Sequence, residues 1–315
     1  MHPAYSVILF TTASGAGYGL VSWIAYTVLT GEVQNGAALN TVAFGLGLLL
    51  IAGGLLSSTA HLGRPERAWR AFSQWQTSWL SREGVVALAT FAPILLLAWA
   101  VIIRDVSPSL AALAAVLTII GAGVTVYCTG MIYASLRTIP AWNRPVVAPI
   151  YIVLSLTTGG VLYCALMAAF GRDIGSVGWL TLLAIFASLA LKAFYWGDID
   201  TAPRKWTAED ATGLGRFGRV TPLEPPHTQP NFVMREMGYK VARKHADKLR
   251  WSTTLCLGII PGGALLLALL TGGVFAVVLT LAAVISAAIG VLTERWLFFA
   301  EAKHIVTVYY EGGAV

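Results

Sequence analysis

Eight long runs of apolar residues occupy most of this 315-residue chain and limit what it can fold into. A helix needs about 20 apolar residues to cross about 30 Å of hydrocarbon, and each run has that length. The runs are continuous rather than alternating, which favours helices over the strands of a membrane barrel. The predicted spans are residues 5–30, 39–60, 83–103, 109–136, 146–170, 177–196, 251–270 and 274–297.

The composition places the chain in the membrane class. Hydrophobic residues make up 57% and charged residues 11%, with a mean hydropathy of +0.72, whereas about 25% of a soluble domain is charged. The first run is followed closely by another and has no basic segment before it, so it does not resemble a cleaved signal peptide. We predict an all-α integral membrane protein: one transmembrane domain over 1–315, a bundle of eight transmembrane helices with both termini on the same side.

Lysine and arginine are unevenly divided between the two sides of this predicted bundle. The connections opposite the termini hold only Arg104 and Arg172. The positive-inside rule therefore predicts a multi-pass protein of a bacterial inner membrane with cytoplasmic termini. Basic loops that dock a partner would give the same asymmetry. The basic residues on the terminus side are Arg64, Arg67, Arg70, Arg82, Arg137, Arg144, Arg204, Lys205, Arg216, Arg219, Arg235, Lys240, Arg243, Lys244, Lys248, Arg250 and Lys303.

Cysteine and histidine argue against a redox centre within the chain. The three cysteines lie apart in apolar spans without a C-x-x-C motif, which indicates structural thiols, so an iron–sulfur cluster would belong to a partner. None of the five histidines lies in the middle of a span, which excludes a two-haem relay across the bilayer. We predict no haem or iron–sulfur cluster here; a single haem on the terminus side, held by some of His2, His61 and His304, is the alternative.

His61 ends the second span and is the most informative single residue. Gly63 and Pro65 form a rigid turn after it, and Arg64, Arg67 and Arg70 follow. An imidazole at the membrane interface donates to a quinone carbonyl and exchanges its proton near neutral pH. A histidine that only caps the helix is the structural alternative.

Glu83 is the first residue of the predicted third span and follows Trp79 closely. Ser81 would be the N-cap and Glu83 a first-turn carboxylate favoured by the helix dipole. Beside a quinol site, the same carboxylate would relay protons to water. In the first span, Gly15 and Gly19 have the spacing that lets a second helix or a flat ring approach. Helix packing is the alternative for both glycines.

The connection over residues 197–250 is the one substantial extramembrane segment. It mixes Pro, Gly and aromatic residues with charges of both signs, and ends in a basic amphipathic stretch over 234–250. A membrane-surface helix and a docking surface for a partner subunit are both predicted uses of this stretch.

Several motifs together resemble the membrane-anchor subunit of dimethyl sulfoxide reductase, across essentially the whole chain. They are His2-Pro3-Ala4-Tyr5-Ser6-Val7-Ile8, Thr11-Thr12, His61-Leu62-Gly63-Arg64-Pro65, Trp79-Leu80-Ser81-Arg82-Glu83, Thr138-Ile139-Pro140-Ala141-Trp142-Asn143, Ala211-Thr212-Gly213-Leu214-Gly215 and Pro225-Pro226-His227-Thr228-Gln229-Pro230-Asn231-Phe232. The resemblance implies an anchor without metal that serves a molybdopterin catalytic subunit and an iron–sulfur subunit. It also implies electron exchange with a quinone, menaquinone or ubiquinone, and His61 matches the histidine associated with quinol binding.

Two groups of candidate residues follow from the polar clustering on the terminus side and from this resemblance. The quinone-binding candidates are His61, Arg64, Gly15, Gly19, Trp79, Glu83, Tyr133, Arg137 and Trp142. The partner-docking candidates are Arg67, Arg70, Arg216, Arg219 and His227. No residue of this chain is predicted to be catalytic or to bind metal.

Two alternatives stay open on the sequence. Reductases of this type work on the periplasmic face, whereas related anchors serve cytoplasm-facing sulfite dehydrogenases, and the basic loops favour the second arrangement. The other alternative is a small-solute transporter, which usually has polar groups and broken helices at the midplane. Lys192, Glu294 and Arg295 lie instead towards the terminus-side ends of their spans, which favours the redox anchor.

Overall fold

The structure is a computed structural model that describes residues 5–32, 36–62, 64–103, 106–202, 206–221, 223–224, 229 and 244–311, without the side chains of residues 61, 310 and 311. This described part contains helices and no strand. Eight helices in it are long and apolar enough to cross a membrane. They are Tyr5–Leu29, Ala37–Ala60, Trp79–Ile102, Pro108–Ala134, Val147–Ala169, Gly175–Thr201, Ala246–Thr271 and Gly273–Ala300. The predicted all-α bundle of eight spans is confirmed.

The spans are built from thirteen helical segments. The first three spans are α1 (Tyr5–Leu9), η1 (Phe10–Ser14) and α2 (Gly15–Leu29); α3 (Ala37–Ser57) with η2 (Ser58–His61); and α4 (Trp79–Ile102). The next three are α5 (Pro108–Ala134), α6 (Val147–Ala169) and α7 (Gly175–Thr201). The last two are α11 (Ala246–Thr254), η5 (Leu255–Ile259) and α12 (Ile260–Thr271); and α13 (Gly273–Ala300).

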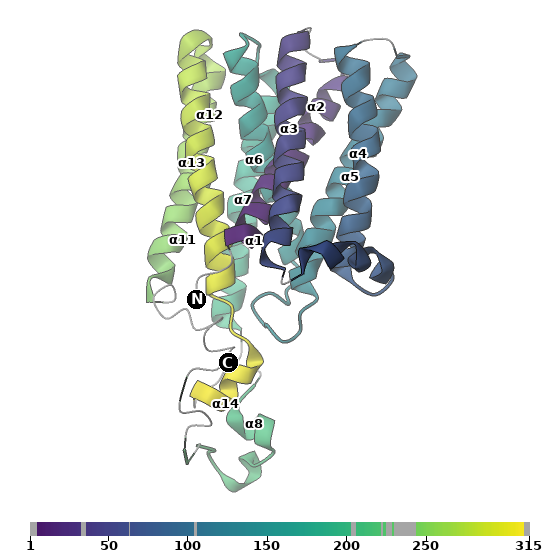
Figure 1. Cartoon of the computed structure of the whole chain (residues 1–315). Helices are drawn as coiled ribbons and strands as arrows, with labels where there is room; N and C mark the ends of the chain where they lie inside the picture. The colour runs from purple at the N-terminus through teal and green to yellow at the C-terminus, as the bar shows by residue number, and fades with distance from the viewer. Residues whose placement is uncertain are drawn as a thin grey trace.

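Both ends of the chain lie at the same end of the bundle, which we call the terminus face (Figure 1, bottom). The short helical elements outside the spans lie at this face too: η3 (Pro65–Gln74), α8 (Ala208–Thr212), η4 (Gly215–Phe217), η6 (Ile305–Thr307) and α14 (Val308–Glu311). The opposite face holds short turns. One joins α12 to α13 through Gly272 and Gly273, whose positive φ angles of 66° and 60° suit glycine.

The first and fifth spans form the centre of the bundle. Within each, 67% of the most apolar window is buried, against 33–39% for the other six. At the contact of α2 with α6, a Cβ atom on Gly19 would lie 1.9 Å from the carbonyl oxygen of Ser155. Helices in lipid associate mainly through such close packing of small residues. The outer helices expose residues such as Leu49 and Phe186 to the surrounding hydrocarbon.

Two spans contain a π-helical turn in the half nearest the terminus face. In η1 the hydroxyls of Thr11 and Thr12 donate to carbonyl oxygens one turn back, at 2.8–3.2 Å, and such bonds distort the helix ladder. In the other, η5 precedes Pro261, which has no amide proton for the ladder. Single π turns in long helices are frequent at functional sites.

The span ends differ from the sequence prediction by a few residues, and two of these differences bear on the site. The third span begins at Trp79, and Ser78 rather than Ser81 is its N-cap, with the Ser78 hydroxyl accepting from the Ser81 amide at 3.5 Å. The assignment of Ser81 as the cap was wrong because the helix continues one turn beyond the apolar run. The long connection is also shorter than 197–250, since α7 continues to Thr201 and α11 begins at Ala246.

Candidate functional site at the terminus face

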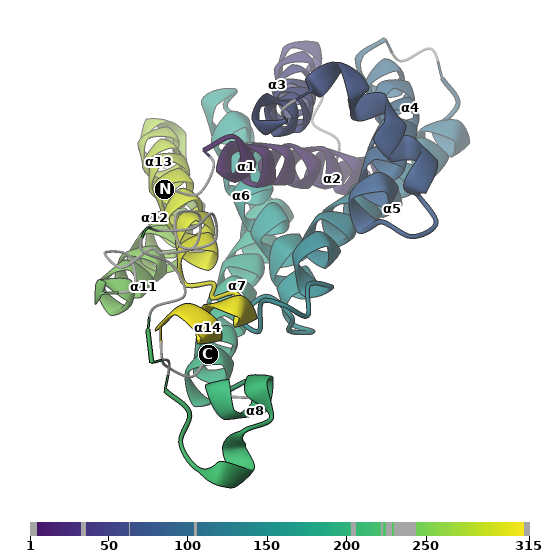
Figure 2. The same ribbon diagram turned by 60° about the horizontal axis from the view of Figure 1, so that its bottom comes forward.

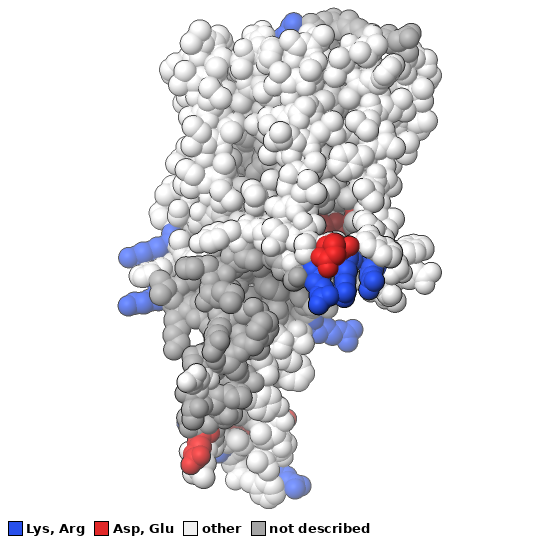
Figure 3. Space-filling model, viewed as in Figure 1, with Lys and Arg blue, Asp and Glu red and all other residues white. Residues whose placement is uncertain are grey.

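Four of the predicted arginines are exposed at the terminus face in the connections after the second and fourth spans: Arg64, Arg67, Arg70 and Arg137. Arg67 lies 3.9 Å from Glu66, but both side chains are half exposed, and such surface pairs contribute little to stability. Figure 3 shows Lys and Arg gathered towards the lower end of the molecule, below a flank that is mostly white. These charges are therefore available to a partner or to lipid headgroups.

The corner between η3 and α4 is held by Arg82. Its guanidinium donates to the carbonyl oxygens of Trp75 and Gln76 at 3.0 and 2.6 Å. It also lies 4.3 Å above the ring of Trp79, whose edge meets Tyr127 with the ring centroids 6.0 Å apart. Trp79 is thus held on two sides where the chain enters the third span, and Figure 2 shows this corner from below.

Glu83 is buried inside the bundle one turn into α4, with 3% of its surface exposed. The hydroxyl of Thr129 on α5 donates to its Oε1 atom. No Lys, Arg or His of the described residues forms an ion pair with Glu83. An ionisable side chain within a membrane span, away from any counter-charge, marks a functional site.

Tyr133 and Trp142 are brought together by an aromatic cluster between α5, α6 and α13. Their ring centroids are 5.3 Å apart, and Tyr133 also stacks on Tyr151 at 5.8 Å. The Trp142 indole stacks on Phe298 and donates to its carbonyl oxygen at 2.9 Å. These two predicted residues are therefore packed against other aromatic rings, and their contact with a quinone stays a prediction.

Gly15 and Gly19 serve the contact between α2 and α6. The Ser155 hydroxyl donates to the Gly15 carbonyl oxygen at 2.6 Å, and Gly19 leaves no room for a side chain against Ser155. Gly15 also borders a small cavity, so the glycines bring the polar residues of two helices to one place.

That small cavity, which we call the polar cavity, has a volume of about 20 Å³. Its lining comes from η1, α2, α5, α6 and α13: Thr11, Thr12, Ser14, Gly15, Val126, Thr129, Tyr151, Leu154, Ser155, Thr158, Val291 and Arg295. Thr129 separates it from Glu83. A cavity of this size holds about one water molecule.

A larger cavity of about 530 Å³ lies at the opposite face. It is lined by the end of α6, the turn at Arg172 and Asp173, and the glycine turn between α12 and α13. Its volume would admit a ring, but most of its lining is apolar or glycine.

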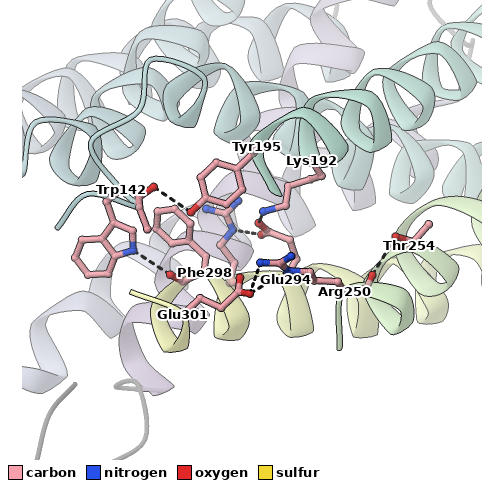
Figure 4. Close-up of polar contacts among 10 residues, drawn as sticks. Trp142, Lys192, Tyr195, Arg250, Thr254, Glu294, Phe298 and Glu301 are labelled. Atoms are coloured by element: carbon pink, nitrogen blue, oxygen red, sulfur yellow. Dashed lines mark hydrogen bonds and ion pairs between the residues drawn. The ribbon is translucent and has the colours of Figure 1, made fainter. Parts of the chain in front are cut away.

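A buried ion cluster between α7 and α13 was not predicted as part of the site. Lys192 Nζ lies 2.7 Å from Glu294 Oε1, and Arg295 Nε lies 2.5 Å from Glu294 Oε2. The three residues are 1–3% exposed, and Figure 4 shows Lys192 and Glu294 facing each other across the two helices. Two cations and one anion leave one positive charge in excess. Their positions near the span ends were predicted, but their pairing was not.

The ion cluster continues towards the terminus face through a second set of ions. Arg250 contacts Asp200 at 2.5 Å and Glu301 at 2.7 Å, which ties α11 to the ends of α7 and α13. Figure 4 shows the contact between Arg250 and Glu301. Burial raises the pKa of Glu301, and the nearby Arg250 opposes that shift. These ion pairs of Arg250 with Asp200 and Glu301 hold the last two spans against α7.

Of the docking candidates in the long connection, Arg216 and Arg219 are exposed, and Arg216 lies 4.6 Å above the ring of Phe217. Glu209 accepts from the Val220 amide at 2.9 Å, and this hydrogen bond lowers the pKa of the Glu209 carboxyl. His227 lies outside the described residues, as do residues 234–243 of the predicted amphipathic stretch.

His304 is the one histidine of the predicted haem alternative whose side chain the structure describes. The Nδ1 atom of His304 accepts from the Val306 amide at 3.2 Å, and the His2 prediction falls outside the described residues. Within the described ranges, no group of three or more His, Cys, Asp or Glu residues is placed to hold a metal ion. The predicted absence of haem and of an iron–sulfur cluster stays a prediction.

Comparison with known proteins gives a family for this arrangement. The family described as DMSO reductase anchor subunit (DmsC) matches residues 1–197. A sulfite dehydrogenase subunit of Allochromatium vinosum is 32% identical over the full length of both proteins. A component of the anaerobic dimethyl sulfoxide reductase of Escherichia coli is 26% identical over 59% of the present protein and 64% of its own length. The protein therefore belongs to the DMSO reductase anchor subunit family and is the multi-pass membrane anchor of a complex of the DMSO reductase or sulfite dehydrogenase type.

Proposed function

We propose that this anchor carries the quinone site of its complex and exchanges electrons between the quinone pool and an iron–sulfur subunit at the terminus face. The observation that carries the proposal is the buried carboxyl of Glu83, partnered by the Thr129 hydroxyl alone among the described residues. Each quinone/quinol conversion moves two electrons and two protons. A carboxyl inside the membrane domain, without a fixed counter-charge, is suited to pass one of these protons.

His61 supplies the second polar group of this proposed site. It ends η2 at the terminus face, the face towards which Glu83 lies at the start of α4. A neutral imidazole hydrogen-bonds a quinone carbonyl, and the carboxyl exchanges the proton. Trp79 and the Tyr133–Trp142 pair lie in aromatic contacts near the same end of the bundle, and Arg64 and Arg137 add exposed positive charge at the terminus face.

The partner subunits dock at the terminus face in this proposal. No route for electrons across about 30 Å of hydrocarbon is predicted in this chain, so the quinone site and the partner's cluster must share a face. Arg67, Arg70, Arg216 and Arg219 are exposed there. A molybdopterin catalytic subunit would bind beyond the iron–sulfur subunit. Cross-links between that iron–sulfur subunit and the turns at Gly31 or Arg172, on the opposite face, would contradict this docking.

The sulfite dehydrogenase type is the better supported of the two. The relative of that type matches over the full length of both proteins, whereas the dimethyl sulfoxide reductase relative matches 59% of the present protein. Sulfite oxidation releases electrons, so the quinone would be reduced and Glu83 would supply a proton to it. The positive-inside rule then predicts that this face is cytoplasmic, at a bacterial inner membrane. Cleavage of the 202–245 connection by protease added only from the periplasm would overturn the orientation.

A small-solute transporter is not favoured by the geometry. The charged residues Lys192, Glu294 and Arg295 pair with one another. The cavity beside Arg295 has room for about one water molecule. A transported solute would need a larger polar cavity near the midplane.

Two substitutions in the purified complex test the proposal. His61→Ala and Glu83→Gln should each lower quinone-coupled turnover at least a hundredfold, while the catalytic subunit keeps its activity with a soluble artificial electron carrier. Glu66→Gln removes an exposed carboxylate on the same face and should change neither rate. Quinone-coupled turnover at the wild-type rate in Glu83→Gln and His61→Ala would refute the quinone site.

A further inference from the structure

The polar cavity is lined by an arginine whose two terminal nitrogens are incompletely paired. Arg295 is 2% exposed, and its Nη1 and Nη2 atoms make no hydrogen bond of standard geometry to the described residues, although the Tyr151 hydroxyl lies near enough to interact with the guanidinium. Its Nε atom is engaged with Glu294, and its guanidinium lies 3.9 Å above the ring of Tyr151. Unpaired donors on a charged group are costly inside a membrane protein, so a ligand that accepts hydrogen bonds is expected beside them.

The other side of the cavity offers acceptors. Every hydroxyl proton of its serine and threonine lining is already donated. Ser14 donates to Phe10 at 2.6 Å, Thr158 to Leu154 at 2.8 Å, and Thr129 to Glu83. The hydroxyl oxygens keep only their lone pairs for the cavity. The Tyr151 hydroxyl makes no hydrogen bond of standard geometry to the described residues, and Arg295 is the side chain nearest to it in interaction.

This mixture of groups selects the ligand. An anion would be attracted by Arg295 but repelled by the lone pairs of the hydroxyl oxygens. A water molecule accepts from the arginine and donates to the hydroxyl oxygens, and the cavity volume of about 20 Å³ suits one water. A quinone ring is far too large for it.

We propose that the polar cavity binds a water molecule, held by Arg295, that joins the ion cluster to Glu83 through Thr129 and gives Glu83 its route for proton exchange. The water donates to the Thr129 hydroxyl, which donates to Glu83. The carboxyl proton exchanges with the Thr129 proton, the Thr129 proton exchanges with one from the water, and the water exchanges in turn with solvent. Each oxygen ends with as many hydrogens as before. Arg295 is a positioning residue in this scheme, because it acts on Glu83 only through the water.

The transfer of the Glu83 proton to quinone rests on the proposed function, whereas the exchange of that proton through the water does not. The test therefore uses no quinone. The intact complex, without added quinone, is moved from H₂O to D₂O at a pH low enough to protonate Glu83. Infrared spectra then follow the carboxyl C=O band, assigned by its loss in Glu83→Gln. A normal exchange rate with failed quinone turnover would count against the proposed function alone.

Matched substitutions distinguish the loss of the proton-exchange route from a nonspecific loss of structure. Thr129→Val and Arg295→Met should each slow the exchange at least tenfold. Thr157→Val is the control, because it removes a buried hydroxyl that pairs with Ser188 at 2.8 Å away from the cavity. If the Glu83 proton exchanges at the wild-type rate in Thr129→Val, the proposed route through Thr129 is wrong. Thr129→Val alone tests this route if Arg295→Met does not accumulate in the membrane. Wild-type exchange in Arg295→Met overturns the role of the arginine.

A high-resolution map of the complex tests the ligand itself. Density for a single water should lie within hydrogen-bond distance of Arg295 and Thr129. An empty cavity, or density for a larger molecule or a heavier ion, overturns the proposal.

Discussion

Two carboxyl groups are buried in the same half of this bundle, and they have opposite surroundings. Glu294 lies between Lys192 and Arg295, with nitrogens at 2.7 and 2.5 Å. Glu83 has the hydroxyl of Thr129 and no cation among the described residues. Both side chains are at most 3% exposed. The same residue type therefore has two roles in one membrane domain, and the neighbours decide which.

The different neighbours indicate a structural role for Glu294 and a role in proton transfer for Glu83. A carboxylate between two cations keeps its charge and ties helices together, because losing it would leave two cations buried without a partner. A carboxyl beside a hydroxyl neutralises no buried cation, so it can gain and lose a proton without leaving a charge unpaired. The polar cavity lies between the two, with Arg295 on one side and Thr129 on the other.

The largest effect is expected from Glu294→Gln. It leaves Lys192 and Arg295 without their counter-charge, and breaking a buried ion pair costs about 3–5 kcal/mol. The thermal midpoint of the purified complex and the amount of assembled anchor should both fall. Glu66→Gln, at an exposed carboxylate, should change stability by less than about 0.5 kcal/mol. Equal stability of the two variants would contradict the claim that Glu294 stabilises the bundle as a counter-charge for Lys192 and Arg295.

Gly19→Ala should disturb the contact between α2 and α6, the two helices that bring Gly15 and Ser155 together beside the polar cavity. The new methyl would lie 1.9 Å from the Ser155 carbonyl oxygen, so α2 and α6 must separate, at a cost of about 1–3 kcal/mol. Gly45→Ala on α3 is the matched control, because a Cβ atom there meets nothing within 4 Å. A helical alanine in open space should stabilise by about 0.5–1 kcal/mol. Thermal unfolding of both variants should therefore shift in opposite directions.

Thr129→Val sharpens the comparison at Glu83. Losing this hydrogen bond should cost about 1 kcal/mol of stability, and quinone-coupled turnover should fall about tenfold, which corresponds to about 1.4 kcal/mol in the barrier. Thr157→Val loses a similar buried bond to Ser188 and should lose the same stability with unchanged turnover. Steady-state kinetics of both variants measure the contrast. Equal turnover losses would mean that Thr129 acts only through packing.

The smallest effect is expected at the surface. Arg67→Gln together with Arg70→Gln removes two exposed charges, and such rim charges change association rates a few-fold at low salt. Binding of the partner subunits to the anchor, measured at two salt concentrations, should weaken and become less salt-dependent. Binding and salt dependence equal to wild type would remove both arginines from the docking surface.

The fold was predictable because the bilayer fixes span length and forces helices. All eight spans were predicted, with ends differing by a few residues. Trp79 was left outside its span because its amphipathic ring and the polar residues after it do not read as apolar. The helix nevertheless continues outward to Ser78, where a side-chain cap ends it.

The site was predictable only where chemistry is visible in single residues. Glu83 stood out as a carboxylate at a span end, and the structure places it inside the bundle with Thr129. The pairing of Lys192 with Glu294 joins residues far apart in the chain, and no local pattern encodes it. Tyr133 and Trp142 were chosen for quinone contact, whereas their described contacts are largely with other aromatic rings.

Labelling of the intact complex with a photoreactive quinone tests the central claim most directly, because it locates the ring. Two places are compared: the proposed site at the terminus face near Glu83, and the larger cavity at the opposite face. Peptides labelled within 58–83 or 129–142, and lost from the pattern when excess unlabelled quinone competes, are the predicted result. Competed labelling confined to 168–174 and 268–277 would contradict the account.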